Sequence, residues 1–361
     1  MIQPIKLFSA FATKQTQQVQ NQQNYQPKFH VNFATKPDTF ERTTQPQAPA
    51  RAESISFTGY KGDEPIRGLG HIVCPCCGVE MMTQKDMNSV SKRLGHSSSQ
   101  AVETLNSYEK YMHPVEKECF NLLKDWSKEK PNTDFKTLLN LHKEPHLTML
   151  QEKQNKILDT VDTLAKGLSE KEQAEVKKVT DITRKLVCSN DKEIKFKRKT
   201  FIKDVKDLAS KISNEEVYKQ MTKEAEKMPT SQNDVSAFIV KYAERGHKEI
   251  GERLVKLSVG TIEHIHPQSE GGRDNVSNYL LECGGCNHTR SSIPLADWVD
   301  EHPEMKENTQ KYIDEVIRRI NSGEVKGISF YPQAVARTLL HESDGKLDID
   351  TSALKQTEEE I

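Results

Sequence analysis

Hydrophobic residues recur at steps of three and four through the middle of the chain, between residues 98 and 257. One such run comprises Leu105, Tyr108, Met112, Val115, Cys119, Leu122 and Trp126. This spacing places the side chains on one face of an amphipathic helix. Pro114 interrupts the run and predicts either a kink or a new helix start. Similar runs begin at Ile157, Val176 and Phe201, so this region is predicted to be a helical bundle or a set of helical hairpins.

Breaks in the pattern divide this region into separate helices. They fall at residues 130–132, 167, 189–191 and 228–230, and Ser231 with Asp234 resembles a capping box that opens the next helix. Beyond the region, an amphipathic helix is predicted over residues 303–321 and a last short helix over 332–341. Residues 344–361 are polar and are predicted to fray as a flexible tail.

The first 60 residues have a different composition. Seven of the twelve residues from Gln15 to Gln26 are Gln, and polar residues continue to about Pro49. Such a segment buries too little apolar surface to offset its ordering entropy, so residues 1–60 are predicted to be a disordered leader. Residues 62–97 are predicted to form strand, cysteine-rich turn and strand around Cys74 to Gly78.

Length and charge narrow the function classes. The chain has 361 residues, with 52 Lys and Arg against 53 Asp and Glu, so nucleic-acid binding would need a local basic patch. Apolar runs are far shorter than the roughly 18 residues of a membrane span. Residues 1–20 lack the pattern of a secretory signal. A cytoplasmic protein without membrane partners is therefore predicted.

Two cysteine pairs suggest a metal site. Cys74 and Cys77 form one Cys-x-x-Cys pair, and Cys283 and Cys286 form another, with 205 residues between the pairs. Two such pairs can supply four thiolates to one structural zinc ion. Two unrelated thiol pairs, or a redox pair, are the alternative. Cys76 is a surplus thiol that could replace Cys74 or Cys77 only with distorted spacing.

The stretch from Thr261 to Arg290 contains the most specific motif. It reads Glu263-His264, then Gly271-Gly272, then Asn278, then Cys-Gly-Gly-Cys-Asn over 283–287. This order resembles the HNH endonucleases, whose core is a β-hairpin and a helix around one metal ion. The match covers about residues 258–291, together with the upstream pair at 74–77.

The resemblance implies a role for each residue. His264 would be the general base, which suits an imidazole whose ordinary pKa is near neutrality. Glu263 and Asn287 would hold a catalytic divalent ion, Mg²⁺ or Mn²⁺, and Asn278 would orient the His264 ring through a hydrogen bond. His266 could bind the metal, contact phosphate, or be an ordinary loop histidine. His288 is a weaker alternative to Asn287.

A nucleic-acid surface is predicted from basic residues. Arg290 is expected to contact phosphate from the helix. A second group, on one stretch without acidic residues, comprises Lys195, Lys197, Arg198, Lys199 and Lys203. A solvated helix face explains such a run equally well, and Lys241, Arg245, Lys248 and Arg253 form an equally plausible surface.

Together these features predict an α+β protein. A small zinc-stapled ββα-metal unit, made from residues 62–97 and 258–300, would carry a helical insertion at 98–257, with helices at 301–343 and a tail at 344–361. The predicted function is a metal-dependent endonuclease, with DNA favoured over RNA. A non-catalytic zinc-dependent nucleic-acid-binding module, or a helical scaffold whose insertion binds a protein, remains the alternative.

Overall fold

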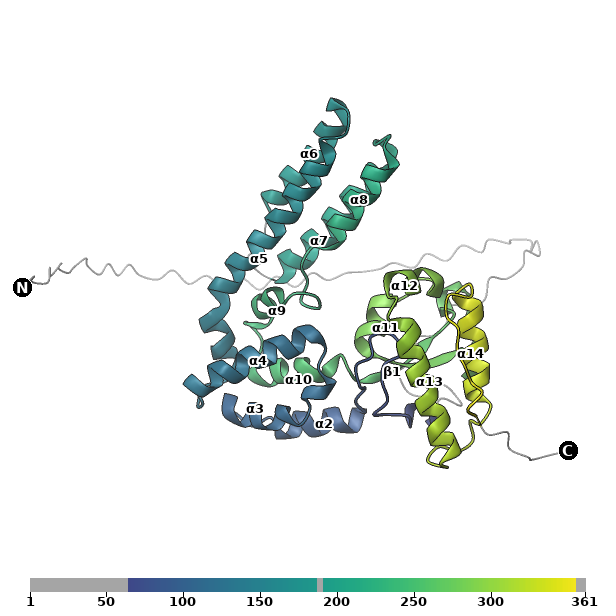
Figure 1. Cartoon of the computed structure of the whole chain (residues 1–361). Helices are drawn as coiled ribbons and strands as arrows, with labels where there is room; N and C mark the ends of the chain where they lie inside the picture. The colour runs from purple at the N-terminus through teal and green to yellow at the C-terminus, as the bar shows by residue number, and fades with distance from the viewer. Residues whose placement is uncertain (1–63, 187–190, 355–361) are drawn as a thin grey trace, which may run out of the picture. The chain divides into compact units, whose positions relative to one another are not determined.

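The computed structural model describes residues 64–186 and 191–354, and of residues 64, 65 and 191–197 it describes the backbone alone. The predicted leader at 1–60 lies outside these ranges. Within them the fold is mainly helical, with one small antiparallel sheet of two strands (Figure 1). This coarse form of the predicted fold class is confirmed.

One hydrophobic core joins helices from both ends of the middle region. It contains buried side chains such as Phe120, Leu139 and Phe238. Capping boxes at Thr83 and Ser97 fix the starts of the helices that begin at Gln84 and Ser98. The helices around this core are α2 (Gln84–Arg93), α3 (Ser98–Asn106), α4 (Pro114–Glu129), α9 (Val235–Tyr242), α10 (His247–Lys256) and the first half of α5 (Phe135–Ala165), with a 3₁₀ turn at Glu109–Tyr111.

A second core fills the pair of helical hairpins that rises at the top of Figure 1. Phe201 and Val161 are fully buried there. Its elements are the second half of α5, α6 (Glu170–Arg184), α7 (Asp191–Lys206), a 3₁₀ turn at Asp207–Ser210 and α8 (Glu215–Glu226). None of the helices in the described ranges has the length and apolarity needed to cross a membrane.

A third core surrounds the sheet. Strands β1 (Gly260–His264) and β2 (Tyr279–Cys283) pair antiparallel, with Gly260 opposite Cys283 and His264 opposite Tyr279. The packed helices are α1 (Glu64–Arg67), α11 (Gly284–Arg290), α12 (Leu295–Glu301), α13 (Met305–Asn321) and α14 (Tyr331–Glu342), with 3₁₀ turns at Gln268–Glu270 and Val276–Asn278.

Buried tyrosines attach the C-terminal helices to the sheet. The hydroxyl of Tyr331 donates to the carbonyl of Tyr279, and the hydroxyls of Tyr312 and Tyr331 lie 2.9 Å apart. Two strands of this length cannot hold together alone in water. The sheet is therefore stable only with α13 and α14 packed against it.

The chain leaves the third core and returns to it at the same place. The Met82 N–H donates to the Ser258 carbonyl, and the Gly260 N–H donates to the Met82 carbonyl, each at 2.9 Å. The whole stretch from α2 to α10 lies between these two points. The segments that carry the two cysteine pairs are thus neighbours in space.

Local details differ from the sequence predictions at two places. Val73 and Glu80 form an isolated bridge, and Gln84–Arg93 is a helix, so the described part of this segment, residues 64–97, does not form two strands. Asp234 caps α9 by accepting the Ala237 N–H, in place of a box opened by Ser231. By contrast, Pro114 starts α4, which resolves the predicted choice between a kink and a new helix.

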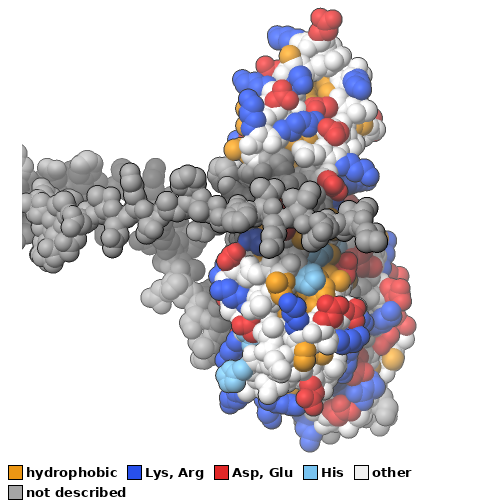
Figure 2. Space-filling model, turned by 90° about the vertical axis from the view of Figure 1, so that its left-hand side faces the viewer, with side chains coloured by type: hydrophobic (Ala, Val, Ile, Leu, Met, Phe, Trp, Pro, Cys, Tyr) orange, Lys and Arg blue, Asp and Glu red, His pale blue; other side chains and the backbone are white. Residues whose placement is uncertain are grey.

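Surface charge is mixed on the face drawn in Figure 2. Lys and Arg side chains alternate with Asp and Glu over the upper helices in that view. Ion pairs such as Arg184 with Asp159 and Lys211 with Glu175 explain this alternation. Exposed pairs of this kind add little stability, but they keep the helix faces solvated.

One ion pair is buried and links two helices of the first core. Arg253 of α10 lies 2.7 Å from Glu116 of α4, and both side chains are at most 10% exposed. The Arg253 Nε also donates to the Tyr242 hydroxyl at 2.7 Å. Removing one partner of such a pair leaves a buried charge uncompensated.

We expect Arg253→Met to lower the free energy of unfolding by about 3 to 5 kcal/mol, because Glu116 would stay buried without its partner. Urea denaturation followed by circular dichroism measures this. The double variant Glu116→Gln/Arg253→Met should recover part of the loss. A double variant as unstable as the sum of the two singles would mean that the pair is not coupled.

Candidate metal centre and strand–helix site

The first cysteine pair lies in a tight turn. The Cys74 N–H donates to the Val79 carbonyl at 2.8 Å, and the Gly78 N–H donates to the Cys74 carbonyl at 3.0 Å. Gly78 has a φ of 73°, a conformation that favours glycine. A side chain there would also collide with Asn308. The turn therefore requires glycine directly after the second thiol.

The second pair lies where β2 passes into α11. Cys283 is the last residue of β2 and the N-cap of α11, and its sulfur accepts the Cys286 N–H at 3.4 Å. Both sulfurs therefore lie on the first turn of the helix. Helix α13 supports the opposite pair, because Asn308 donates to the Cys76 carbonyl at 2.8 Å and Thr309 to the Pro75 carbonyl at 3.1 Å.

The sulfurs of Cys74, Cys77, Cys283 and Cys286 lie within 4.8 Å of one another. Those of Cys77 and Cys283 are 3.8 Å apart. The hydrogen bond with Cys283 lowers the pKa of Cys77, and the hydrogen bond between Cys286 and Cys283 raises the pKa of Cys286. Four converging thiols fit a structural metal such as zinc.

A second donor group borders the first. Cys76, Glu282 and Cys286 also offer ligand atoms within 4.8 Å of one another. Glu282 is 1% exposed, and burial raises the pKa of its carboxyl well above the usual range. Cys76 is thus buried next to the four-thiol cluster, and Cys286 belongs to both donor groups.

The segment from β1 to α11 forms a hairpin followed by a helix. The connecting loop, residues 265–278, folds tightly at Gly271 and Gly272. Gly271 has a φ of 96°, and a Cβ on Gly272 would lie 1.9 Å from the His266 carbonyl oxygen. Close backbone packing in the loop therefore requires this glycine pair.

Glu263 is buried against α11. Its Oε1 lies 2.5 Å from Arg290 Nη1, and the two side chains are 10% and 2% exposed. Burial raises the pKa of Glu263 to about 7, against the lowering effect of Arg290. Arg290 also donates to the carbonyls of His264 and Ile265. The Arg290 guanidinium is therefore buried against the end of β1, whereas the sequence predicted that it contacts phosphate at the surface.

His264 faces the loop and not α11. Its Nε2 lies 2.8 Å from Asp274 Oδ1, and its ring packs edge-on against Tyr279. Burial alone would raise the pKa of Asp274, but hydrogen bonds from His264 and Gln268 outweigh it and lower this pKa. A carboxylate that binds one imidazole nitrogen fixes the orientation of the ring. Glu263 and His264 therefore pack against different elements, as alternation along a strand requires.

Asn278 holds the loop backbone. Its Oδ1 accepts the His266 N–H at 2.8 Å, and its Nδ2 donates to the carbonyls of His266 and Arg273. The structure thus corrects the predicted bond between Asn278 and the His264 ring, since Asp274 makes that contact. Asn278 positions His264 indirectly, through the loop that carries Asp274.

Two other predicted ligands have protein partners. The Nδ2 of Asn287 donates to the Ile262 carbonyl at 3.1 Å, which places this side chain at the contact of α11 with β1. The ring of His266 binds Glu342 of α14 at 2.7 Å and the Glu270 carbonyl at 3.1 Å. His266 therefore ties the loop to α14, a contact that agrees with the alternative of a loop histidine.

The predicted basic stripe is divided in the structure. The side chains of Lys195 and Lys197 lie outside the described residues. Arg198 donates to the carbonyls of Met228 and Glu226, Lys199 is exposed, and Lys203 pairs with Asp207. The three described side chains, Arg198, Lys199 and Lys203, therefore have different surroundings.

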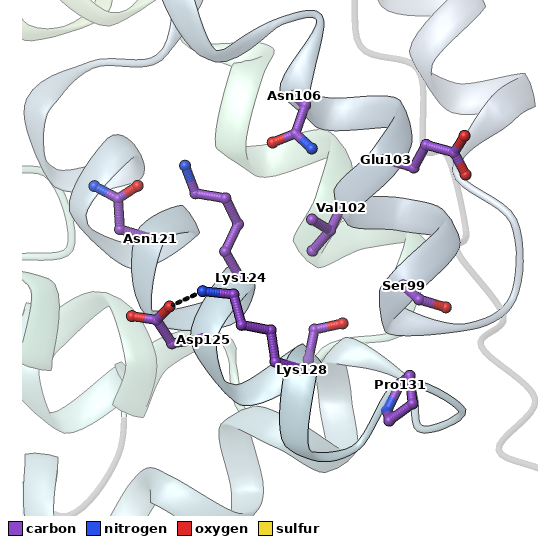
Figure 3. Close-up of a pocket in the computed structure, with 10 residues that line it drawn as sticks. Ser99, Val102, Glu103, Asn106, Asn121, Lys124, Asp125, Lys128 and Pro131 are labelled. Atoms are coloured by element: carbon purple, nitrogen blue, oxygen red, sulfur yellow. Dashed lines mark hydrogen bonds and ion pairs between the residues drawn. The ribbon is translucent and has the colours of Figure 1, made fainter.

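A cavity of about 660 Å³ lies elsewhere, between α3 and α4. Figure 3 shows Lys124, Asp125 and Lys128 from one wall of it and Glu103 and Asn106 from the other, with an ion pair between Asp125 and Lys128. Both charge signs line it, and none of the predicted site residues does. The chemistry suggested by the sequence is therefore not located at this cavity.

Sequence reasoning missed Asp274, Glu282 and Glu342. Asp274 lies in the loop between the predicted Gly-Gly and Asn278, and a carboxylate in that loop was a signal for a partner of His264. Glu282 directly precedes the second cysteine pair in an otherwise apolar strand. Glu342 had no local signal, because its contact with His266 depends on how α14 packs.

Comparisons with protein-family models, with curated proteins and with solved structures each found no match to this chain.

We expect freshly purified protein to hold one zinc ion per chain, measured by elemental analysis. Cys283→Ser/Cys286→Ser should lose the ion and melt at a lower temperature, because the metal joins two distant segments. Cys76→Ser is the matched control and should retain the zinc. Loss of zinc in Cys76→Ser, with zinc retained in the single variant Cys283→Ser, would instead assign the ion to Cys76, Glu282 and Cys286.

The His266–Glu342 pair should make stability depend on pH. The hydrogen bond between His266 and Glu342 raises the pKa of His266 in the folded protein. The pair therefore stabilises the fold fully below the pKa that His266 has in the unfolded chain, and this stabilisation is lost as pH rises through the pKa of His266 in the folded protein. From about pH 6 to about pH 8, the wild type should therefore lose more thermal stability than Glu342→Gln. His341→Ala keeps the His266–Glu342 bond and removes only the contact of His341 with Glu342 at 3.0 Å, so its pH profile should stay closer to that of the wild type than the profile of Glu342→Gln does. Equal pH profiles for the wild type and Glu342→Gln would contradict the prediction.

Proposed function

We propose that the protein is a metal-dependent nuclease of the HNH type, which hydrolyses phosphodiester bonds in nucleic acid. Three features support this proposal together. The chain forms a hairpin followed directly by a helix, the motif residues Glu263, His264 and Asn287 lie on these elements, and a four-thiol cluster flanks them.

The contact between His264 and Asp274 carries the proposal. His264 is the last residue of β1, its side chain is 12% exposed, and Asp274 binds it at 2.8 Å. An imidazole held by a carboxylate is the arrangement of a general base, because the carboxylate orients the ring and stabilises the protonated form. His264 would accept the proton of the attacking water.

Glu263 and Asn287 would hold the catalytic ion. Their donor chemistry fits a hard divalent ion such as Mg²⁺ or Mn²⁺, since a carboxylate and an amide offer oxygen ligands. Asn287 uses its nitrogen toward Ile262, which leaves Oδ1 as its ligand atom. When bound, the ion would neutralise charge on the phosphate and polarise the scissile bond.

Arg290 has a positioning role in this proposal. It bonds Glu263 through one nitrogen and the backbone at His264 and Ile265 through others. A single guanidinium therefore fixes the carboxylate and the strand end that carries the base. Asn278 performs the same task for the loop that carries Asp274.

A non-catalytic nucleic-acid-binding module is the second candidate. The ion pair of Glu263 with Arg290 favours it, because this carboxylate already has a cationic partner. In that case the zinc-stapled unit would bind nucleic acid, and no reaction would take place at His264.

The test is cleavage of supercoiled plasmid, single-stranded DNA and RNA with Mg²⁺, Mn²⁺ or EDTA. We expect metal-dependent cleavage that His264→Ala reduces by about 100-fold or more, since a general base contributes at least this much. Asp274→Asn should reduce it less, by about tenfold, because the ring remains but loses its orienting charge.

His96→Ala is the matched control, because His96 is an exposed histidine before α3 and far along the chain from the motif. It should cleave as the wild type does, and all variants should keep their zinc. Unchanged cleavage by His264→Ala would show that His264 is not the general base. Absence of cleavage in the wild type, with nucleic acid still bound, would select the binding module.

A further inference from the structure

A cleft separates the helical region from the outer face of α11. Two adjoining cavities of about 580 and 610 Å³ form it, and they share Arg198, Thr230, Gln232, Leu257 and Thr289. One wall comes from α7 and the loop before α9. The other wall comes from α11 and the residue that follows it, Ser291.

The charge of the cleft is one-sided. Among the described residues that line it, none is Asp or Glu, although about one residue in seven of the chain is acidic. The lining includes Arg198, Lys199, Lys241, Arg253 and His288. This contrasts with the mixed charges on the face in Figure 2. A cleft lined by one sign of charge concentrates ligands of the opposite sign.

The cationic groups of the cleft have different partners. Arg253 is neutralised by Glu116 behind the wall. Arg198 donates to two carbonyls at 3.3 Å, bonds that fix the guanidinium but leave its positive charge. Lys199, one residue on, is exposed at the rim. Gln232 adds a side-chain amide to the lining, whereas the hydroxyls of Thr230 and Thr289 donate to Asn233 Oδ1 and to the Gly285 carbonyl.

Helix α11 connects the cleft with the motif residues. Asn287 and Arg290 face β1, where they bond the carbonyl of Ile262 and the carboxylate of Glu263. His288 and Thr289, between them in sequence, line the cleft instead. The motif and the cleft are therefore opposite faces of one short helix.

We propose that this cleft binds the phosphodiester backbone of a nucleic acid, with Lys199 and Lys241 as phosphate contacts. The helical region then forms one wall of the binding site. A phosphate chain fits a lining that combines spaced cations with the side-chain amide of Gln232, since both kinds of group bind phosphate oxygens. This inference deepens the proposed function and rests on it for the class of ligand.

The experiment measures binding separately from cleavage. Fluorescence anisotropy with the zinc-loaded full-length protein, without added Mg²⁺ or Mn²⁺, follows labelled single-stranded DNA, duplex DNA and RNA of one sequence. Lys199→Glu/Lys241→Gln should weaken binding by about tenfold or more and should reduce the salt slope by roughly 1.5 to 2, because two phosphate contacts are lost. Comparison of the three probes shows whether the cleft prefers the backbone of single-stranded DNA, duplex DNA or RNA.

Lys203→Glu is the matched control. Lys203 lies one turn after Lys199 on α7, pairs with Asp207 and does not line the cleft. Binding by this variant should stay within about twofold of the wild type, since it makes no phosphate contact. Equal losses in the control and the cleft variant, or no loss in either, would overturn the proposal. So would a polyglutamate peptide that binds the cleft more tightly than every nucleic acid.

Failure of this inference and failure of the proposed function give different results. Cleavage that depends on His264 but is unaffected by the cleft variant contradicts the cleft alone. Binding that depends on Lys199 and Lys241, without cleavage in Mg²⁺ or Mn²⁺, contradicts the nuclease and supports the cleft.

Discussion

The convergence of four thiols on one point is the constraint on which the rest of this structure depends. Cys77 and Cys283 are 206 positions apart in sequence, yet their sulfurs lie 3.8 Å apart. Neither segment has enough secondary structure to hold this position alone, since one is a turn and the other ends a five-residue strand. A metal bound at this point, with α13 packed behind the first turn, would explain why so small a sheet has a defined place.

The same convergence organises the strand–helix site. Cys283 ends β2 and caps α11, so the thiol cluster also sets where α11 begins. From that start, the helical repeat brings Asn287 and Arg290 onto β1 and turns His288 and Thr289 away from it. The carboxylate of Glu263, buried under Arg290, and the imidazole of His264, held by Asp274, then lie on opposite faces of one strand end. Their separation follows from strand geometry and not from the motif.

Much of the fold was predictable because its signals are local. The helical period, Pro114 and the breaks at Lys130, Gly167 and Met228 all act within a few residues, and helices begin or end near each of them. The two cysteine pairs were predictable for the same reason, since their spacing fits one metal. Contacts between residues that are distant in the sequence were not predictable. The burial of Arg290 and the contact of His266 with Glu342 depend on how α11 and α14 pack, and no local pattern records that packing.

The position of the two cysteine pairs has a consequence for synthesis on the ribosome. Cys74 and Cys77 leave the exit tunnel long before Cys283 and Cys286, and at 5 to 20 residues per second this delay is roughly 10 to 40 s. Helices form in microseconds, so the intervening helices have time to fold while the first pair of thiols waits. During that interval the nascent chain exposes two thiols without their partners, open to oxidation or to capture of a metal by an incomplete ligand set.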